Sequence, residues 1–185
     1  MISFESIETN RLLLKAVDAN KLAEIYATCD EEEAMKLLGF STREEYLADK
    51  AKSDGGFVTY DRKILGFIMV IKEGDIAIGR CGFHNWYHVH KRAELGYAIF
   101  KENYRGHGYM REAMPALLDY GFNKMNLNRI EAFIGPTNEP SLRVVKKHGF
   151  TEEGRLKQHF VYDDTPLDSL IFALLREEYF QQSGG

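Results

Sequence analysis

The segment best suited to chemistry is rich in glycine and runs Arg105-Gly106-His107-Gly108-Tyr109-Met110, at the junction of an expected strand and an expected helix. Glycine lets the backbone turn sharply, so that successive N–H groups can point at one ligand. The N-terminus of the following helix adds a partial positive charge. These features predict a loop that binds a phosphate or diphosphate, although two glycines alone are as typical of a tight turn without a ligand.

Two familiar nucleotide motifs do not fit this loop. The dinucleotide fingerprint G-x-G-x-x-G needs a third glycine where the chain has Arg111, although Glu131 lies about where the ribose-binding acid is expected. The phosphate loop G-x-x-x-x-G-K-S/T does not occur in the sequence. A nicotinamide site and an ordinary nucleoside triphosphatase are therefore disfavoured.

Three histidines, His84, His88 and His90, flank Trp86 and Tyr87. A structural zinc ion needs four ligands on a fixed scaffold, whereas this stretch is expected to be a loop after a strand. We therefore predict no metal site. Position alone suggests that Trp86, with its aromatic neighbours, binds the acceptor side of a substrate cleft, and ordinary aromatic packing is the alternative.

Five further segments stand in order around the loop, at residues 8–14, 93–97, 129–132, 138–141 and 148–150. Together with the loop they resemble the GNAT superfamily of N-acetyltransferases, and within it the RimJ/RimL-like branch of ribosomal-protein N-terminal acetyltransferases. In that superfamily a loop of pattern Q/R-x-x-G-x-G/A binds the diphosphate of acetyl-CoA. The chain matches this pattern except at Met110, where a small residue is usual.

The resemblance implies an α/β (α+β) fold, with a mixed, mainly antiparallel, twisted sheet of six to seven strands flanked by helices. It implies one domain over residues 1–185 that moves acetyl from acetyl-CoA directly to a primary amine, such as the α-amine of a protein or peptide. A small amine (a polyamine, an amino acid or an aminoglycoside) is an alternative acceptor, and a non-catalytic acyl-CoA-binding module is a second alternative. A homodimer is compatible with the resemblance.

The same resemblance assigns the acetyl-CoA site to one set of residues: Ile99, Phe100, Arg105, Gly106, His107, Gly108, Tyr109, Met110, Asn138 and Lys147. It also suggests Glu94 as the base, because this residue lies on the strand that enters the loop. The alternative is an outward carboxylate paired with Lys91 or Arg92. His159, where the branch has a glutamate, is either a substitute base or a surface residue.

The group that protonates the departing thiolate is less usual. Many members of the superfamily use a tyrosine at the position that is Val145 here. Ser141, at the start of a short helix, is the expected substitute, because a hydroxyl and the helix dipole both favour a developing thiolate. An ordinary first-turn helix residue is the alternative interpretation.

Composition sets the class of protein that must position these groups. The chain has 185 residues, 44% of them apolar and 28% charged, and a net charge of −4, so a single globular domain is expected and nucleic acid is a poor partner. Cys29 and Cys81 are expected to be free thiols in a reducing compartment. The first residues do not resemble a signal peptide, and the apolar runs are too short to cross a membrane, which favours a cytoplasmic location.

Hydrophobic periodicity predicts the elements. We expect strands at residues 11–17, 64–71, 75–83, 92–100, 128–134, 155–162 and 167–175. We expect helices after Asp18, beginning at the acidic run 30–33, which suits a helix N-terminus, from residue 41 to about 52, from Gly108 to 122, and over 141–148. Helices should therefore flank a mainly antiparallel sheet.

Overall fold

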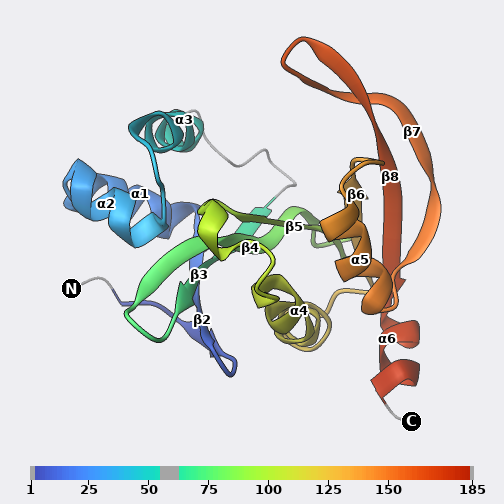
Figure 1. The fold of residues 1–185 in the computed structure, drawn as a ribbon. Coiled ribbons are helices and arrows are strands. Elements are labelled where there is room, and N and C mark those ends of the chain that lie inside the picture. Colours follow the sequence, from blue (N-terminus) through green and yellow to red (C-terminus); the bar gives the residue numbers. More distant parts are fainter. Residues whose placement is uncertain (1–2, 55–62, 184–185) are drawn as a thin grey trace.

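The computed structural model describes residues 3–54 and 63–183 (Figure 1). The strands are β1 (Ser6–Glu8), β2 (Leu12–Asp18), β3 (Lys63–Ile71), β4 (Ile76–Tyr87), β5 (Arg92–Ile99), β6 (Arg129–Ile134), β7 (Thr151–Tyr162) and β8 (Thr165–Leu175). The α-helices are α1 (Ala19–Thr28), α2 (Glu31–Leu38), α3 (Arg43–Asp54), α4 (Tyr109–Asp119), α5 (Glu139–Lys147) and α6 (Arg176–Ser183). A 3-10 turn, Glu102–Tyr104, precedes α4, and a π-helical turn, Tyr120–Lys124, follows it.

The described strands form one sheet in the order β1-β2-β3-β4-β5-β6-β8-β7. Neighbouring strands are antiparallel except β5 and β6, which are parallel. Their ladder covers only three residue pairs, from Arg92↔Arg129 to Glu94↔Glu131. Beyond these pairs β5 and β6 are no longer hydrogen-bonded, so the sheet is split where both strands still continue.

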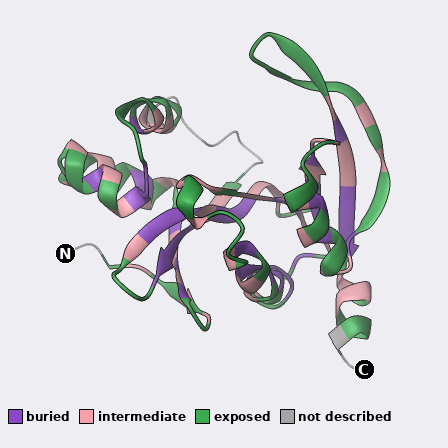
Figure 2. Cartoon of the chain, viewed as in Figure 1, coloured by how far each residue is buried: buried purple, intermediate pink, exposed green. Residues whose placement is uncertain are grey.

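Helices cover both faces of the sheet, and each face has its own buried cluster (Figure 1). Side chains alternate along a strand, so Leu12 and Leu14 pack with α4 and α5 on one face, whereas Val17 packs with α1, α2 and α3 on the other. Buried residues follow the middle strands and α4 in Figure 2, while β7 is exposed along most of its length. We call these two faces the α4 face and the α1–α3 face.

Local capping explains where the first helices begin. The Asp18 carboxylate accepts a hydrogen bond from the Lys21 backbone N–H at 2.8 Å, and Asp30 forms a reciprocal capping box with Glu33. The Thr42 hydroxyl accepts from the Glu45 N–H at 3.2 Å. These contacts satisfy backbone donors that lack a partner within the helix.

The predicted mixed, mainly antiparallel architecture is confirmed, with eight strands rather than six to seven. The additional strand, β1, has three residues, too few for a periodic pattern. Strand β4 continues to Tyr87, so His84 and Trp86 lie on a strand and not in a loop. Cys29 and Cys81 are free thiols as predicted, and burial raises the pKa of Cys81. Among the described helices, none is long and apolar enough to cross a bilayer.

Candidate active site

A cleft of about 430 Å³ lies where β5 and β6 separate. Its lining comes from both strands, from the start of α5 and from the β7–β8 hairpin: His84, Glu94, Leu95, Gly96, Tyr97, Ala132, Phe133, Ile134, Gly135, Asn138, Ser141, His159, Phe160 and Ser169. Four of the residues singled out in the sequence, Glu94, Asn138, Ser141 and His159, therefore meet in one cavity. The split in the sheet brings them together.

Glu94 lies in this cleft with its side chain 17% exposed. Its carboxylate accepts a hydrogen bond from Asn85 Nδ2 at 2.9 Å, and His84 Nδ1 lies 3.4 Å from Glu94 Oε2. The alternative pairing with Arg92 is absent from the described contacts, since Arg92 Nη1 donates to Glu131 at 2.5 Å instead. Ala93 and Leu95 pack on the α4 face, so Glu94 faces the α1–α3 side of the sheet.

Ser141 lies in the first turn of α5, on the α4 face of the sheet and therefore on the face opposite Glu94. Asn138 caps this helix, because its Oδ1 accepts from the Ser141 N–H at 3.3 Å. The Tyr97 hydroxyl donates a long hydrogen bond to the Ser141 carbonyl oxygen at 3.4 Å. Burial raises the pKa of Tyr97, which keeps its phenol protonated at neutral pH. Tyr97 had no role in the sequence analysis, and its only signal was its place in the motif at residues 93–97.

His159 reaches the cleft from β7. Its Nδ1 lies 3.0 Å from the hydroxyl of Ser169, which is only 2% exposed, and its ring lies 5.0 Å from the ring of Phe133. The buried hydroxyl and the neighbouring ring hold the imidazole in one orientation. His159 therefore stays a second candidate for the proton acceptor.

The glycine-rich segment forms the entrance to α4. Gly106 and Gly108 both have φ of +78°, the left-handed region that favours glycine, and Gly108 is the N-cap of α4. The Arg105 side chain is anchored to the chain before the loop, where its Nε donates to the Ile99 carbonyl at 3.0 Å. Met110 is 6% exposed and packs in the core, so a large residue at this position leaves the outer side of the loop open.

The other predicted site residues lie elsewhere. Phe100 stacks on Phe40 at 5.7 Å in the cluster of the α1–α3 face, and Lys147 is exposed at the end of α5. Trp86 packs against the main core, with its ring 3.9 Å from that of His88, and is not among the cleft-lining residues. The described residues contain no cluster of side chains able to hold a metal ion.

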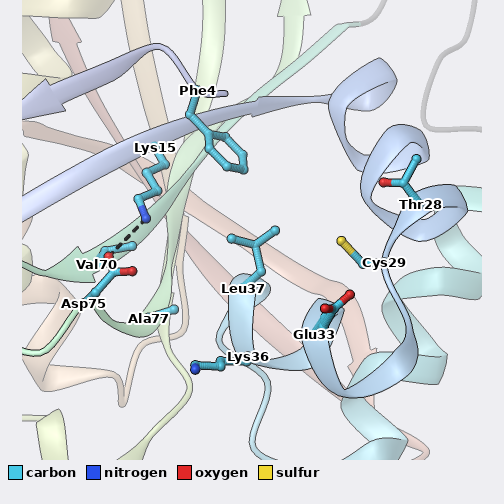
Figure 3. Close-up of a pocket in the computed structure, with 10 residues that line it drawn as sticks. All are labelled: Phe4, Lys15, Thr28, Cys29, Glu33, Lys36, Leu37, Val70, Asp75 and Ala77. Atoms are coloured by element: carbon cyan, nitrogen blue, oxygen red, sulfur yellow. Dashed lines mark hydrogen bonds and ion pairs between the residues drawn. The ribbon is translucent and has the colours of Figure 1, made fainter. Parts of the chain in front are cut away.

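A larger hollow of about 630 Å³ lies on the α1–α3 face and shares no lining residue with the cleft (Figure 3). Phe4 and Leu37 point into it, and Lys15 pairs with Asp75 across one side at 3.1 Å. Its lining contains none of the residues predicted to handle protons, whereas Glu94, Ser141 and His159 all line the cleft. We therefore take the smaller cleft as the candidate active site.

Comparison with known proteins shows the family to which the chain belongs. The family model described as acetyltransferase (GNAT) domain matches residues 11–151, so the chain belongs to the GNAT acetyltransferases. It is an N-acetyltransferase of this type, for which the domain implies acetyl-CoA as the acetyl donor.

Several relatives are named after an activity. The uncharacterized N-acetyltransferase YnaD of Bacillus subtilis is 33% identical over 94% of this chain and 98% of its own length. The spermidine N(1)-acetyltransferase of Escherichia coli is 30% identical over 51% of this chain and 50% of its own. A solved structure from Vibrio cholerae, described as a candidate ribosomal-protein-serine acetyltransferase, is 26% identical with a TM-score of 0.65, covering 92% of this chain and 97% of its own.

The residues present suit acetyl-CoA. The loop at residues 105–108 is exposed at the N-terminus of α4, where backbone N–H groups and the helix dipole favour a diphosphate. The separated edges of β5 and β6 leave backbone groups outside the sheet ladder, and these can bond the amide-rich arm of the thioester carrier. The loop and α5 lie on the α4 face, so the donor is expected to enter from that face.

Proposed function

We propose that this chain acetylates the α-amine of a protein or peptide, as the RimJ/RimL-like resemblance implies. The supporting observation is the charge of the cleft: among its lining residues Glu94 is the sole carboxylate. A polyamine carries several positive charges, and a site built for it is expected to present several carboxylates. One carboxylate beside the apolar rings of Phe133 and Phe160 suits a single amine with a neighbouring side chain.

The proposed reaction needs few groups. Acetyl-CoA supplies an acetyl group already activated as a thioester. Glu94, on the α1–α3 side of the split, accepts the proton of the amine, directly or through water. Ser141, on the α4 side, would donate a hydrogen bond from its hydroxyl toward the departing sulfur, while Tyr97, whose hydroxyl donates to the Ser141 carbonyl, would support this end of α5. The two proton-handling groups thus lie on opposite sides of the sheet.

The basicity of the acceptor decides how much the base contributes. Deprotonating an α-amine of pKa near 8 at pH 7 costs about 1 kcal/mol, whereas an alkyl amine of pKa near 10.4 costs about 4.6 kcal/mol. A single partly exposed carboxylate is sufficient for the first task. This difference also gives an experimental signature, described below for Glu94→Gln.

A small amine such as spermidine is the second candidate acceptor. The observation that favours it is the 30% identity to the spermidine N(1)-acetyltransferase of Escherichia coli over about half of each chain. The two acceptors are separated by a screen that follows acetyl transfer by mass spectrometry. The panel contains a peptide with a free N-terminus, the same peptide with a blocked N-terminus and an internal lysine, and spermidine. We expect acetylation of the free N-terminus, whereas acetylation of spermidine alone would contradict the proposal, and acetyl-CoA binding without any turnover would indicate a non-catalytic module.

Replacing Glu94 by Gln is expected to lower kcat for the peptide about tenfold at pH 7, since about one α-amine in ten is already neutral at that pH. Raising the pH to about 9 should restore most of the loss, because the amine then deprotonates without help. The measurement is the pH profile of kcat for both proteins. If kcat at pH 7 fell in His159→Gln but not in Glu94→Gln, His159 would be the proton acceptor instead.

Replacing Ser141 by Ala is expected to lower kcat about tenfold while the Kd for acetyl-CoA changes less than about twofold, because the hydroxyl acts on charge that develops only during transfer. Steady-state kinetics and a binding titration on the same preparation measure the two quantities. Arg143→Ala, an exposed change on the same helix, is the matched control. An unchanged kcat in Ser141→Ala would contradict the role proposed for Ser141.

A further inference from the structure

The N-terminal motif at residues 8–14 has no role in the proposed reaction, yet it contacts the entrance to α4. Thr9 and Arg11 precede β2, and Glu112 lies in the first turn of α4, about a hundred residues later. The Thr9 hydroxyl donates to Glu112 Oε1 at 2.6 Å, and the Arg11 backbone N–H donates to the same oxygen at 2.6 Å. Arg11 Nε donates to Glu112 Oε2 at 2.6 Å. One carboxylate therefore fixes the turn that carries Arg11.

The Arg11 guanidinium lies directly against the glycine loop. Its Nη1 donates to the His107 carbonyl at 3.2 Å, and the group stacks over the Tyr109 ring at 4.5 Å from the ring centre. Its Nη2 lies 3.9 Å from where a Cβ would stand on Gly108. The side chain is 44% exposed. A cation is thus held at the surface of the loop, with one nitrogen facing the turn of left-handed glycines.

The charges around the loop explain why a cation is favourable at this position. A carboxylate in the first turn of a helix stabilises the helix, but Glu112 would also repel a diphosphate bound at the same N-terminus. Burial raises the pKa of Glu112, yet the hydrogen bonds from Thr9 and Arg11 outweigh it and bring the pKa below its usual value, so the group is ionised at neutral pH. Arg11 neutralises this charge and presents further N–H donors on the outer side.

We propose that Arg11 binds the diphosphate of acetyl-CoA from outside the glycine loop, and that Glu112 and Thr9 are the positioning residues that hold it there. The proposal rests on acetyl-CoA being the donor. Arginine suits this role because its planar guanidinium can bond Glu112 along one edge and phosphate oxygens through the remaining donors. The N-terminal segment thereby completes a site whose backbone part comes from residues 105–110.

Replacing Arg11 by Met tests the proposal, since methionine keeps apolar cover over Tyr109 while removing the charge. We expect the Kd for coenzyme A, measured by isothermal titration, to rise about tenfold or more. The dependence of Kd on NaCl should become shallower, because one screened charge contact is lost. Arg11→Lys should give a Kd between that of the unaltered chain and that of Arg11→Met. Arg43→Met, which removes an exposed arginine paired with Glu31 on α2, is the matched control and should bind like the unaltered chain.

A purely structural Arg11 would give a different result. It would lower the thermal unfolding midpoint and weaken binding to the same degree at every salt concentration, and that outcome would overturn the proposal. Arg11→Met binding coenzyme A as tightly as the unaltered chain would overturn it as well. If the unaltered chain itself did not bind coenzyme A, the donor assignment would fail first and take this inference with it.

Discussion

Replacing Gly108 by Val is expected to raise the Kd for acetyl-CoA at least about thirtyfold. Gly108 has φ of +78° at the N-cap of α4, a backbone conformation that costs a branched residue about 1–3 kcal/mol. The chain can relieve this strain only by turning the loop, which moves the N–H groups away from the diphosphate. The added side chain would also stand 3.9 Å or less from Arg11 Nη2, in the space that the phosphate needs. A binding titration measures the effect.

A matched control distinguishes an effect at the glycine loop from a general effect of replacing glycine by valine. Gly154 lies in β7 without a positive φ, and a Cβ there would meet nothing within 4 Å. Gly154→Val should therefore bind acetyl-CoA normally. Circular dichroism and the unfolding midpoint establish that Gly108→Val remains folded, since the strain is confined to one turn. Normal affinity in folded Gly108→Val would show that the diphosphate binds elsewhere.

Replacing Glu131 by Ala is expected to lower the free energy of unfolding by about 2–3 kcal/mol. Glu131 is 7% exposed and lies at the last residue pair before β5 and β6 separate. It accepts hydrogen bonds from Arg92 at 2.5 Å and from Arg129 at 3.0 Å. Without the carboxylate, Arg92 loses this partner at the base of the split and Arg129 keeps only its pair with Glu153. We therefore expect the substitution to disturb the cleft as well as to lower the overall stability.

Denaturant unfolding measures the free energy of unfolding of Glu131→Ala, and Glu153→Ala serves as the matched control. Glu153 is 41% exposed and also pairs with Arg129, at 2.6 Å, so its removal should cost about 1 kcal/mol or less. The hydrogen bond from Arg129 lowers the pKa of Glu153, so this smaller contribution is present at neutral pH and is lost as the pH falls through that lowered pKa. Equal losses in the two variants would contradict a special role for the buried carboxylate.

The parts of the fold that sequence reasoning found were those with local signals. The cap at Asp18, the acidic run 30–33 at a helix N-terminus and the apolar face of α4 depend on residues a few positions apart, and all three are present in the structure. The end of β4 was missed because Asn85 adopts φ of +46° within a register shift between His84 and Tyr87. Such an irregularity breaks the alternation from which a strand is recognised.

The site was predictable only in pieces. The loop at residues 105–110 has a chemical signature of its own, whereas Glu94, Ser141 and His159 become neighbours only because β5 and β6 separate after three residue pairs. No local pattern encodes that separation. The contact of Arg11 with Glu112 joins segments about a hundred residues apart, and its donors and acceptor are ordinary surface residues in the sequence.

A crystal structure of the chain with coenzyme A bound would decide where the donor lies. We expect the diphosphate oxygens at hydrogen-bond distance, about 3 Å, from backbone N–H groups of residues 106–110, with the pantetheine arm between β5 and β6. A diphosphate bound instead in the hollow lined by Lys15 and Lys36 would contradict the assignment of the cleft as the active site (Figure 3).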